Sequence, residues 1–214
     1  MALSIIDENK DYMVIHKPAG LATQTARLGE KDLISEVSNY LHEKGESCRV
    51  SVINRLDQPV EGLVLIAKHE KAAAALSKQL SEGKIEKYYE ARVYGHIKEK
   101  SGVLEDYLVK DGKTNLSRVS SKNDKQAKKA ILEYTVRESD EETDTVEIHL
   151  ITGRHHQIRV QFSHAGYPLV GDRKYGDVES INYTINNEIK TVSLKAVKVS
   201  FLDLKTGNRI AYII

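Results

Sequence analysis

The sequence is organised around one stretch, Val52-Ile53-Asn54-Arg55-Leu56-Asp57-Gln58-Pro59-Val60-Glu61-Gly62-Leu63-Val64-Leu65-Ile66-Ala67. Within it, Arg55 and Asp57 lie among short apolar residues. A turn follows at Pro59 and Gly62, and an apolar run typical of a buried strand comes next. A charged pair on a loop that a strand holds in place is well suited to chemistry. Taken alone, the stretch slightly favours a simpler interpretation, an ordinary surface turn with a solvated aspartate.

The bulk composition is typical of a soluble globular protein. The 214 residues are enough for one well-cored domain, and 40% hydrophobic with 29% charged residues argue against wholesale disorder. The single cysteine, Cys48, excludes an internal disulfide framework. The N-terminus does not resemble a signal peptide, and no apolar run approaches the ~20 residues that a membrane-spanning helix needs. We therefore expect one domain over residues 1–214, located in the cytoplasm and not in a membrane.

Charge is balanced in total but segregated along the chain. The formal net charge is +1, which is not the large positive excess of a nonspecific nucleic-acid binder. Residues 110–129 carry seven basic residues and two acidic ones, whereas residues 138–144 carry five acidic ones. This segregation predicts either a basic face beside an acidic edge or a solvated loop.

The spacing of apolar residues predicts a mixture of helices and strands. Helical spacing predicts helices over 31–44, 69–82 and 155–165. Runs of β-branched and aromatic residues predict strands over 12–17, 63–67, 87–94, 130–136, 145–151, 192–202 and 210–213. Residues 104–121 indicate a loop-rich insertion that could form a hairpin. Because strands and helices do not alternate strictly, we expect an α+β fold with a mixed, mostly antiparallel central sheet flanked by helices and loops.

Three places combine loops, charge and aromatic rings. They are Arg55 with Asp57, Tyr88 with Tyr89, and residues 153–159. A carboxylate, several arginines and stacking aromatic rings suit an anionic substrate that contains rings. Arginine matches phosphate and tyrosine stacks on bases, so RNA is the natural candidate for the substrate.

Other chemistries fit the sequence less well. His155 and His156 are neighbours and do not share a face of a helix, and no cysteine accompanies them, so we expect no metal site. Asp57 and Glu61 could form a carboxylate pair of the glycosidase type. A turn that contains proline separates these two carboxylates, so a glycosidase is a weaker alternative.

The chain resembles the RluA-type RNA pseudouridine synthases over nearly its whole length. Five motifs carry the resemblance, in the order and spacing of that family: His16-Lys17-Pro18-Ala19-Gly20-Leu21, Asn54-Arg55-Leu56-Asp57 with Gly62, Lys87-Tyr88-Tyr89-Glu90-Ala91 with Gly95, Thr152-Gly153-Arg154-His155-His156-Gln157-Ile158-Arg159, and Gly171-Asp172-Arg173-Lys174-Tyr175-Gly176. Each motif is weak alone, but five in the right order are specific.

The resemblance implies that Asp57, Tyr89 and Arg159 are catalytic. Asp57 would attack the target nucleotide or take its proton, Tyr89 would pack against the flipped uracil, and Arg159 would pair with the carboxylate. Arg55 would help to displace the flipped nucleotide. A nearby guanidinium favours the ionised form of a carboxylate, and an aromatic platform helps to offset the cost of unstacking a base. The reaction is an isomerisation, so we expect no cofactor.

Four further residues of these motifs are expected to bind the substrate together with Arg55. They are Lys17, Arg154, His156 and Gln157. The resemblance implies ribosomal or transfer RNA as the partner. We expect a monomer, because the sequence shows neither a coiled-coil pattern nor a long exposed apolar stripe.

Three residues depart from the family pattern near Asp57. Asn54 replaces the usual histidine, and Val60-Glu61 replaces Thr-Ser, which removes two hydroxyls and adds a negative charge near the expected path of the RNA. We expect an active enzyme, and the alternative is a catalytically silent RNA-binding or folding factor on the same scaffold. The catalytic pattern begins within the first twenty residues, so we expect no small RNA-binding domain before it.

Overall fold

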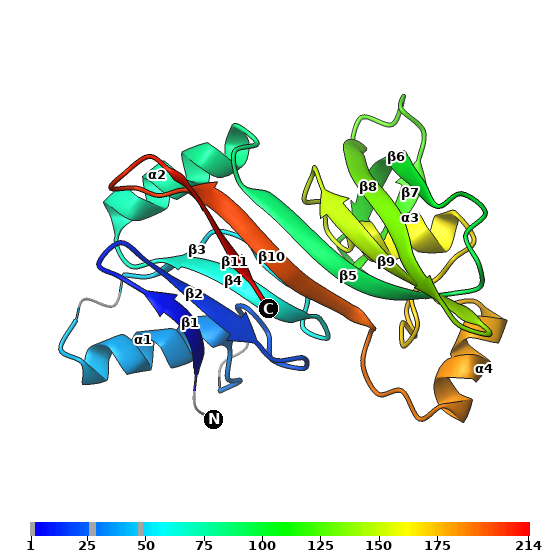
Figure 1. The fold of residues 1–214 in the computed structure, drawn as a ribbon, viewed down its shortest axis with the longest axis horizontal. Coiled ribbons are helices and arrows are strands. Elements are labelled where there is room, and N and C mark those ends of the chain that lie inside the picture. The colour runs from blue at the N-terminus through cyan, green and yellow to red at the C-terminus, as the bar shows by residue number, and fades with distance from the viewer. Residues whose placement is uncertain (1–2, 26–28, 47–48) are drawn as a thin grey trace. The chain divides into compact units, whose positions relative to one another are not determined.

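The computed structural model describes residues 3–25, 29–46 and 49–214, so Cys48 lies outside the described residues. The chain is α+β, with eleven strands and four helices in the described part (Figure 1). It divides into two compact units. The first unit comprises Met1–Lys87 and Ala196–Ile214, and the second comprises Tyr88–Lys195. A single catalytic domain over residues 1–214 stays a prediction.

The first unit is built on an antiparallel sheet. Strands β1 (Ser4–Glu8), β2 (Tyr12–Lys17), β4 (Glu61–Ala67) and β10 (Leu194–Leu202) follow one another in it. The short β3 (Ser51–Val52) pairs with β4, and β11 (Arg209–Ile213) pairs with β10. Strand β2 runs against β4 from the pair Tyr12 and Ala67 to the pair Lys17 and Gly62. This register brings the start of β4, just after Asp57, beside the end of β2.

Two helices belong to the first unit, and both form where the spacing of apolar residues predicts them. Helix α1 (Leu33–Glu43) begins after Asp32, whose carboxylate accepts a 2.7 Å hydrogen bond from the N–H of Ser35. Helix α2 (Glu70–Ser81) packs Ala72 and Leu76 into a core that also contains Leu65 and Phe201. Burial of this apolar face fixes α2 on the sheet.

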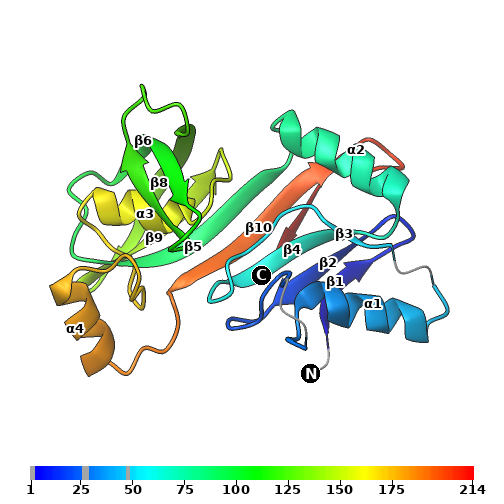
Figure 2. The same ribbon diagram turned by 180° about the vertical axis from the view of Figure 1, so that it is seen from behind.

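The second unit is built on another run of antiparallel strands. Strands β5 (Glu86–Tyr94), β9 (Thr143–Leu150), β8 (Lys128–Ser139), β6 (Ser101–Asp111) and β7 (Leu116–Ser120) follow one another in that order (Figure 2). The described ladders β5–β9, β9–β8, β8–β6 and β6–β7 are all antiparallel. Helices α3 (Gln157–His164) and α4 (Val178–Asn186) complete the unit. The mostly antiparallel sheet is therefore confirmed.

Two local expectations need correction. Residues 104–121 are not loop-rich, because β6 and β7 form a regular hairpin there, which was the other possibility. Helix α4 was not predicted at all. Its apolar residues Val178 and Ile185 are exposed, whereas the polar Ser180 and Thr184 are buried, so the apolar spacing gives no signal. Among the described residues, no helix has the length and apolar character of a membrane span.

Candidate active site: the Asp57 loop and the Arg159 cluster

Asp57 lies on the loop between β3 and β4 of the first unit, and its side chain is partly exposed. The buried Asn54 ties this loop to β4. Its side-chain amide donates to the carbonyl oxygen of Leu63 at 3.0 Å, and its side-chain oxygen accepts from the N–H of Leu65 at 2.8 Å. The departure from the family pattern at Asn54 therefore satisfies two backbone groups and holds the loop.

Thr23 holds the same loop from the other side. Its hydroxyl donates to the carbonyl oxygen of Leu56 at 2.7 Å and lies 3.1 Å from the N–H of Leu56. The N–H of Val60 donates to the carbonyl oxygen of Asp57 at 3.0 Å and closes the turn. Contacts on both sides of Asp57 restrict its backbone, which is what a positioned reactive group needs. Thr23 carries no local signal in the sequence, because its contact lies 33 residues away in the chain.

Lys17 is fully buried next to this loop. Its Nζ donates to the carbonyl oxygens of Pro18 at 2.9 Å, Leu21 at 2.7 Å and Gln58 at 3.3 Å. These bonds use all three donors of an ammonium group. Burial lowers the pKa of Lys17 to about 8, against the opposing effect of the carboxylates of Asp57 and Glu61. The contacts favour a positioning role, and binding of substrate by Lys17 stays a prediction.

Gly62 is required by the packing of β4. Its φ is +123°, and a Cβ atom at this position would lie 2.3 Å from the carbonyl oxygen of Ala196 in β10.

Arg55 lies on the same loop as Asp57, and its side chain is exposed. An exposed guanidinium at this place is accessible to an anionic ligand.

Arg159 lies on α3 of the second unit and is held by Asp172. The guanidinium Nε donates to Asp172 Oδ2 at 2.7 Å, and Nη2 donates to Asp172 Oδ1 at 2.7 Å. Both side chains are buried, at 3% and 0% exposure. The ring of Tyr175 lies 5.1 Å from the guanidinium carbon. This two-bond pairing and the ring hold Arg159 in one orientation.

The loop at residues 171–176 supplies the partners of Arg159. Asp172 also accepts from the backbone N–H groups of Lys174 at 3.0 Å and Tyr175 at 3.3 Å. These bonds fold the loop around the carboxylate that meets Arg159. In the sequence, Asp172 belongs to one of the five motifs, but no role is predicted for it. An acidic residue in a turn rich in glycine was the available signal.

His156 marks the start of α3 and has a left-handed backbone, with φ of +53°. Its Nδ1 lies 2.7 Å from the hydroxyl of Tyr175, and its ring stacks on His155 at 3.7 Å between centroids. His155 Nδ1 in turn lies 2.9 Å from Ser117 Oγ. These contacts connect the start of α3 to β7 and to the loop that holds Asp172.

Gln157 organises the turn before α3. Its side-chain oxygen accepts from Thr152 Oγ1 at 2.8 Å and from the N–H of Arg154 at 2.9 Å, and its amide donates to the carbonyl oxygen of Ile131 at 3.0 Å. Arg154 is exposed, and its Nε donates to the carbonyl oxygen of Lys129 at 2.8 Å. Of these two predicted substrate ligands, Arg154 is thus the accessible one.

The two tyrosines of β5 point to opposite faces of their strand, as neighbours in a strand do. Tyr88 stacks on His149 of β9 at 4.5 Å between ring centroids. Tyr89, opposite Ile148 in the ladder, is buried at 5% exposure. Within residues 3–25, 29–46 and 49–214, no cluster of three or more histidine, cysteine or acidic residues could hold a metal ion.

The predicted site residues fall into two groups. Lys17, Arg55 and Asp57 belong to the first unit. The second unit contains Tyr89, Arg154, His156, Gln157 and Arg159. The structure brings His156 and Arg159 to one ring, that of Tyr175. The pairing of Asp57 with Arg159 stays a prediction.

Residues 11–164 match the model of a family described as RNA pseudouridylate synthase. The chain belongs to this family. It is 33% identical over 177 residues to an RNA pseudouridine synthase of Bacillus subtilis, YhcT, and covers 58% of that relative. It is 30% identical over 205 residues to the dual-specificity RNA pseudouridine synthase RluA of Vibrio parahaemolyticus, covering 94% of this chain and 78% of the relative.

Another relative agrees with this family, and a solved structure agrees with the fold. The ribosomal large subunit pseudouridine synthase D of Pseudomonas aeruginosa is 33% identical over 208 residues, which cover 94% of this chain and 63% of the relative. The human RNA pseudouridylate synthase domain containing 4 superposes with a TM-score of 0.79 at 22% identity, covering 99% of this chain and 87% of that structure. These comparisons support the RluA-type resemblance and the fold.

Proposed function

We propose that the protein isomerises specific uridines to pseudouridine in ribosomal or transfer RNA, with Asp57 as the catalytic carboxylate. The observation that carries the proposal is the Asp57 loop. Hydrogen bonds from the side chains of Asn54, Thr23 and Lys17 fix its backbone, while the Asp57 side chain stays partly exposed. A rigid loop that presents one accessible carboxylate suits a group that must meet a reacting atom. Family membership supports the same activity.

The reaction conserves all atoms of the uridine. The bond between N1 of the base and C1′ of the ribose breaks, the uracil turns, and a bond forms between C5 and C1′. The proton of C5 leaves, and N1 takes up a proton, so no oxidant or second substrate is consumed. In this proposal Asp57 acts as nucleophile or base, Tyr89 stacks on the flipped uracil and Arg159 pairs with Asp57. Arg55 occupies or opens the place that the nucleotide leaves.

The other predicted ligands divide by their contacts. Arg154 is exposed and suits a contact with RNA phosphate. His156, Gln157 and Lys17 are buried and bonded within their own units, so their part in substrate binding is to shape the surfaces that present Arg154 and Asp57. The proposal includes a monomer in the cytoplasm. Relatives named ribosomal large subunit pseudouridine synthases support the location.

The test compares two changes of carboxylate to amide. Asp57→Asn should abolish the release of tritium from RNA labelled at C5 of uridine, a loss of about 10³-fold or more for a group that touches the reacting atoms. Glu43→Gln, an exposed site at the end of α1, should retain the wild-type rate. Full activity of Asp57→Asn would refute the role of Asp57. RNA binding by a wild-type protein that releases no tritium would support the silent alternative.

A further inference from the structure

The second unit separates its charges along one strand. β8 has 12 residues, and such a strand spans ~40 Å. It begins at Lys128, directly after a basic loop, and ends at Ser139, directly before an acidic turn. We call the region formed by residues 110–129 the basic end. Its exposed cations are Lys110, Lys113, Arg118, Lys122, Lys125, Lys128 and Lys129.

The two carboxylates within this basic region are occupied in holding its turns. Asp111 accepts from the N–H of Lys113 at 2.8 Å, and Asp124 accepts from Gln126 N–H at 3.0 Å and Ser120 Oγ at 2.8 Å. These hydrogen bonds lower the pKa of both aspartates, so both stay ionised as turn caps. Residues 110–129 contain seven cations and these two anions, a net charge of +5. One of the cations, Lys129, also pairs at 2.8 Å with Glu105, which lies outside this range.

The basic end adjoins the turn that presents Arg154. The Nε of Arg154 donates to the carbonyl oxygen of Lys129 at 2.8 Å, so its guanidinium lies at the start of β8. Ser117 of β7 contacts His155 at 2.9 Å, and its N–H donates to the hydroxyl of Tyr175 at 2.8 Å. The hairpin is thus bonded directly to the residues that surround the start of α3.

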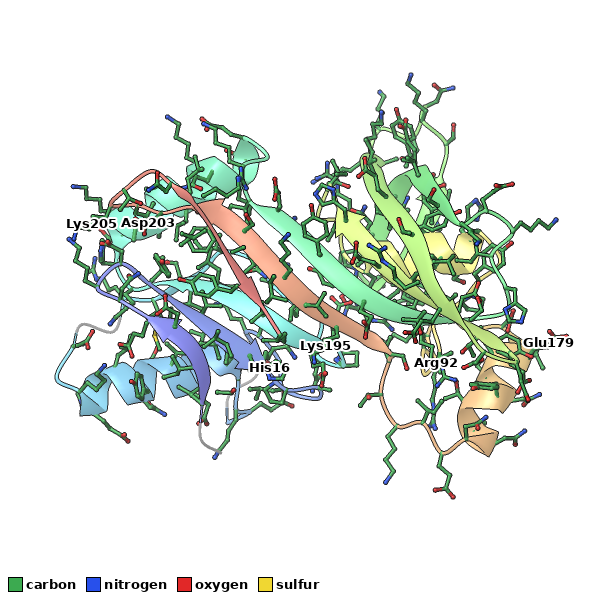
Figure 3. All side chains as sticks on the ribbon, viewed as in Figure 1. His16, Arg92, Glu179, Lys195, Asp203 and Lys205 are labelled. Carbon is green, nitrogen blue, oxygen red and sulfur yellow. The ribbon has the colours of Figure 1, made fainter. Side chains whose placement is uncertain are left out.

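The opposite end of the unit has the opposite sign. Glu142 and Glu179 line a pocket of about 540 Å³ together with Tyr94 and Tyr183. Burial and then these two carboxylates raise the pKa of Tyr94. Figure 3 shows Glu179 on α4, at the other end of the unit from the loop between β7 and β8. The carboxylates at this end repel phosphate, so the basic end is the electrostatically favourable one for an RNA backbone.

We propose that the basic end is an RNA-docking surface, which binds phosphates that flank the target nucleotide and continues the contact of Arg154. The proposal rests on the proposed function and deepens it. Its seven cations lie on the β6–β7 hairpin, the loop that follows it and the start of β8, and none of them is a predicted catalytic residue. Contacts of this kind fix the register of an RNA without reading its bases. The surface therefore contributes affinity and orientation, whereas the choice of uridine is made elsewhere.

The test removes three positive charges in two matched ways. One variant combines Lys113→Gln, Lys122→Gln and Lys125→Gln at the basic end. The control combines Lys98→Gln, Lys100→Gln and Lys190→Gln, which are exposed in the same unit but outside the basic end. Both are made in Asp57→Asn protein, so that the RNA is not altered. The probes are unmodified transcripts of a transfer RNA and of a large-subunit ribosomal RNA segment.

The basic-end variant should bind the tighter probe about tenfold more weakly at low salt, and the slope of log K against log salt should fall by about 2, from three lost contacts. The control should change Kd less than about twofold, since those lysines make no contact in this proposal. Equal losses in the two variants, or an unchanged Kd at the basic end, would overturn the proposal.

A second measurement separates this surface from the catalytic assignment. With Asp57 intact, the basic-end variant should raise KM and leave kcat unchanged, because the lost contacts act equally in ground and transition states. A lower kcat with an unchanged KM would count against docking. A wild-type protein that makes no pseudouridine would refute the proposed function. The salt dependence of RNA binding by the two lysine variants would still test whether the basic end binds RNA.

Discussion

At the scale of single residues, the buried Lys17 ties the stability of the protein to pH. Its pKa is about 8 in the folded protein and 10.5 in its ordinary environment. Between these pH values the unfolded chain binds more protons than the folded chain, so the free energy of unfolding rises as pH rises. The contribution is about 3 kcal/mol over the whole window.

We therefore expect the free energy of unfolding of the wild type to rise relative to that of Lys17→Met from pH 8 to pH 10.5. Urea unfolding at several pH values in this range measures it. Lys17→Gln, which keeps hydrogen-bond donors without the charge, serves as a second variant in case Lys17→Met does not fold. Parallel pH profiles for the wild type and both variants would contradict the shifted pKa.

Asp172 is the second residue with a measurable part in the site. Asp172→Asn removes the charge of the buried carboxylate that accepts two hydrogen bonds from the guanidinium of Arg159, and breaking a buried pair in this way costs about 3–5 kcal/mol. Urea denaturation should show this loss. Glu105→Gln breaks the exposed pair of Glu105 with Lys129, so it should change stability by less than about 1 kcal/mol. Similar effects of the two substitutions would mean that Asp172 does not hold Arg159.

The sequence identified the residues of the candidate site better than their contacts. Motif order was enough to propose Asp57, Arg159 and the loop of Asp172 as candidates, and their catalytic roles stay a prediction. Nothing local indicates that Thr23 contacts Leu56, or that the donors of Lys17 reach Gln58, because these partners lie 33 and 41 residues away. Such contacts depend on which strands pair, and pairing is set by the whole sheet.

At the scale of elements, β4 approaches β10 closely at Gly62. Gly62→Ala should destabilise the protein by several kcal/mol or prevent folding, since the new Cβ would meet backbone atoms of Ala196 at 2.3–2.8 Å. Gly83→Ala is the matched control. Gly83 also has positive φ, at +70°, but open space around it, so its cost should be about 1 kcal/mol. Thermal unfolding compares the two.

If Gly62→Ala proved as mild as Gly83→Ala, the contact between β4 and β10 would have to be looser than the structure shows. Soluble expression of both variants is measured first, because a missing Gly62→Ala protein beside a well-folded Gly83→Ala protein also agrees with the expected order.

Helices were predictable where apolar spacing and caps agree. Helices α1 and α2 have both, with Asp32 and His69 as N-caps, and the predicted and observed bounds differ by one or two residues at each end. Helix α4 has an N-cap at Asp177 but buries Ser180 and Thr184. The hydroxyl of Thr184 accepts from the N–H of Gly171 at 3.0 Å, so this helix packs partly through hydrogen bonds that periodicity does not detect.

At the scale of the whole molecule, composition and local spacing indicated the α+β class but not the division into two units. The boundaries fall inside regular strands, between Lys87 and Tyr88 in β5 and between Lys195 and Ala196 in β10. Linkers rich in glycine, proline or serine are the usual sign of a boundary, and no such linker lies at either of these two boundaries. The segregation of charge in residues 110–144, in contrast, was visible in the sequence and becomes the two ends of the second unit.

The order of the two units in the chain has a consequence for synthesis on the ribosome. The second unit is a continuous segment inserted into the first, and strands β10 and β11 follow it in the chain. Val199 and Phe201, which complete the core around Leu65 and Leu76, are therefore made after the second unit. The second unit can therefore fold on the ribosome before the sheet that supports the loop of Asp57 is complete. The proposed catalytic carboxylate is therefore translated before the second unit, but its supporting sheet is completed only after that unit.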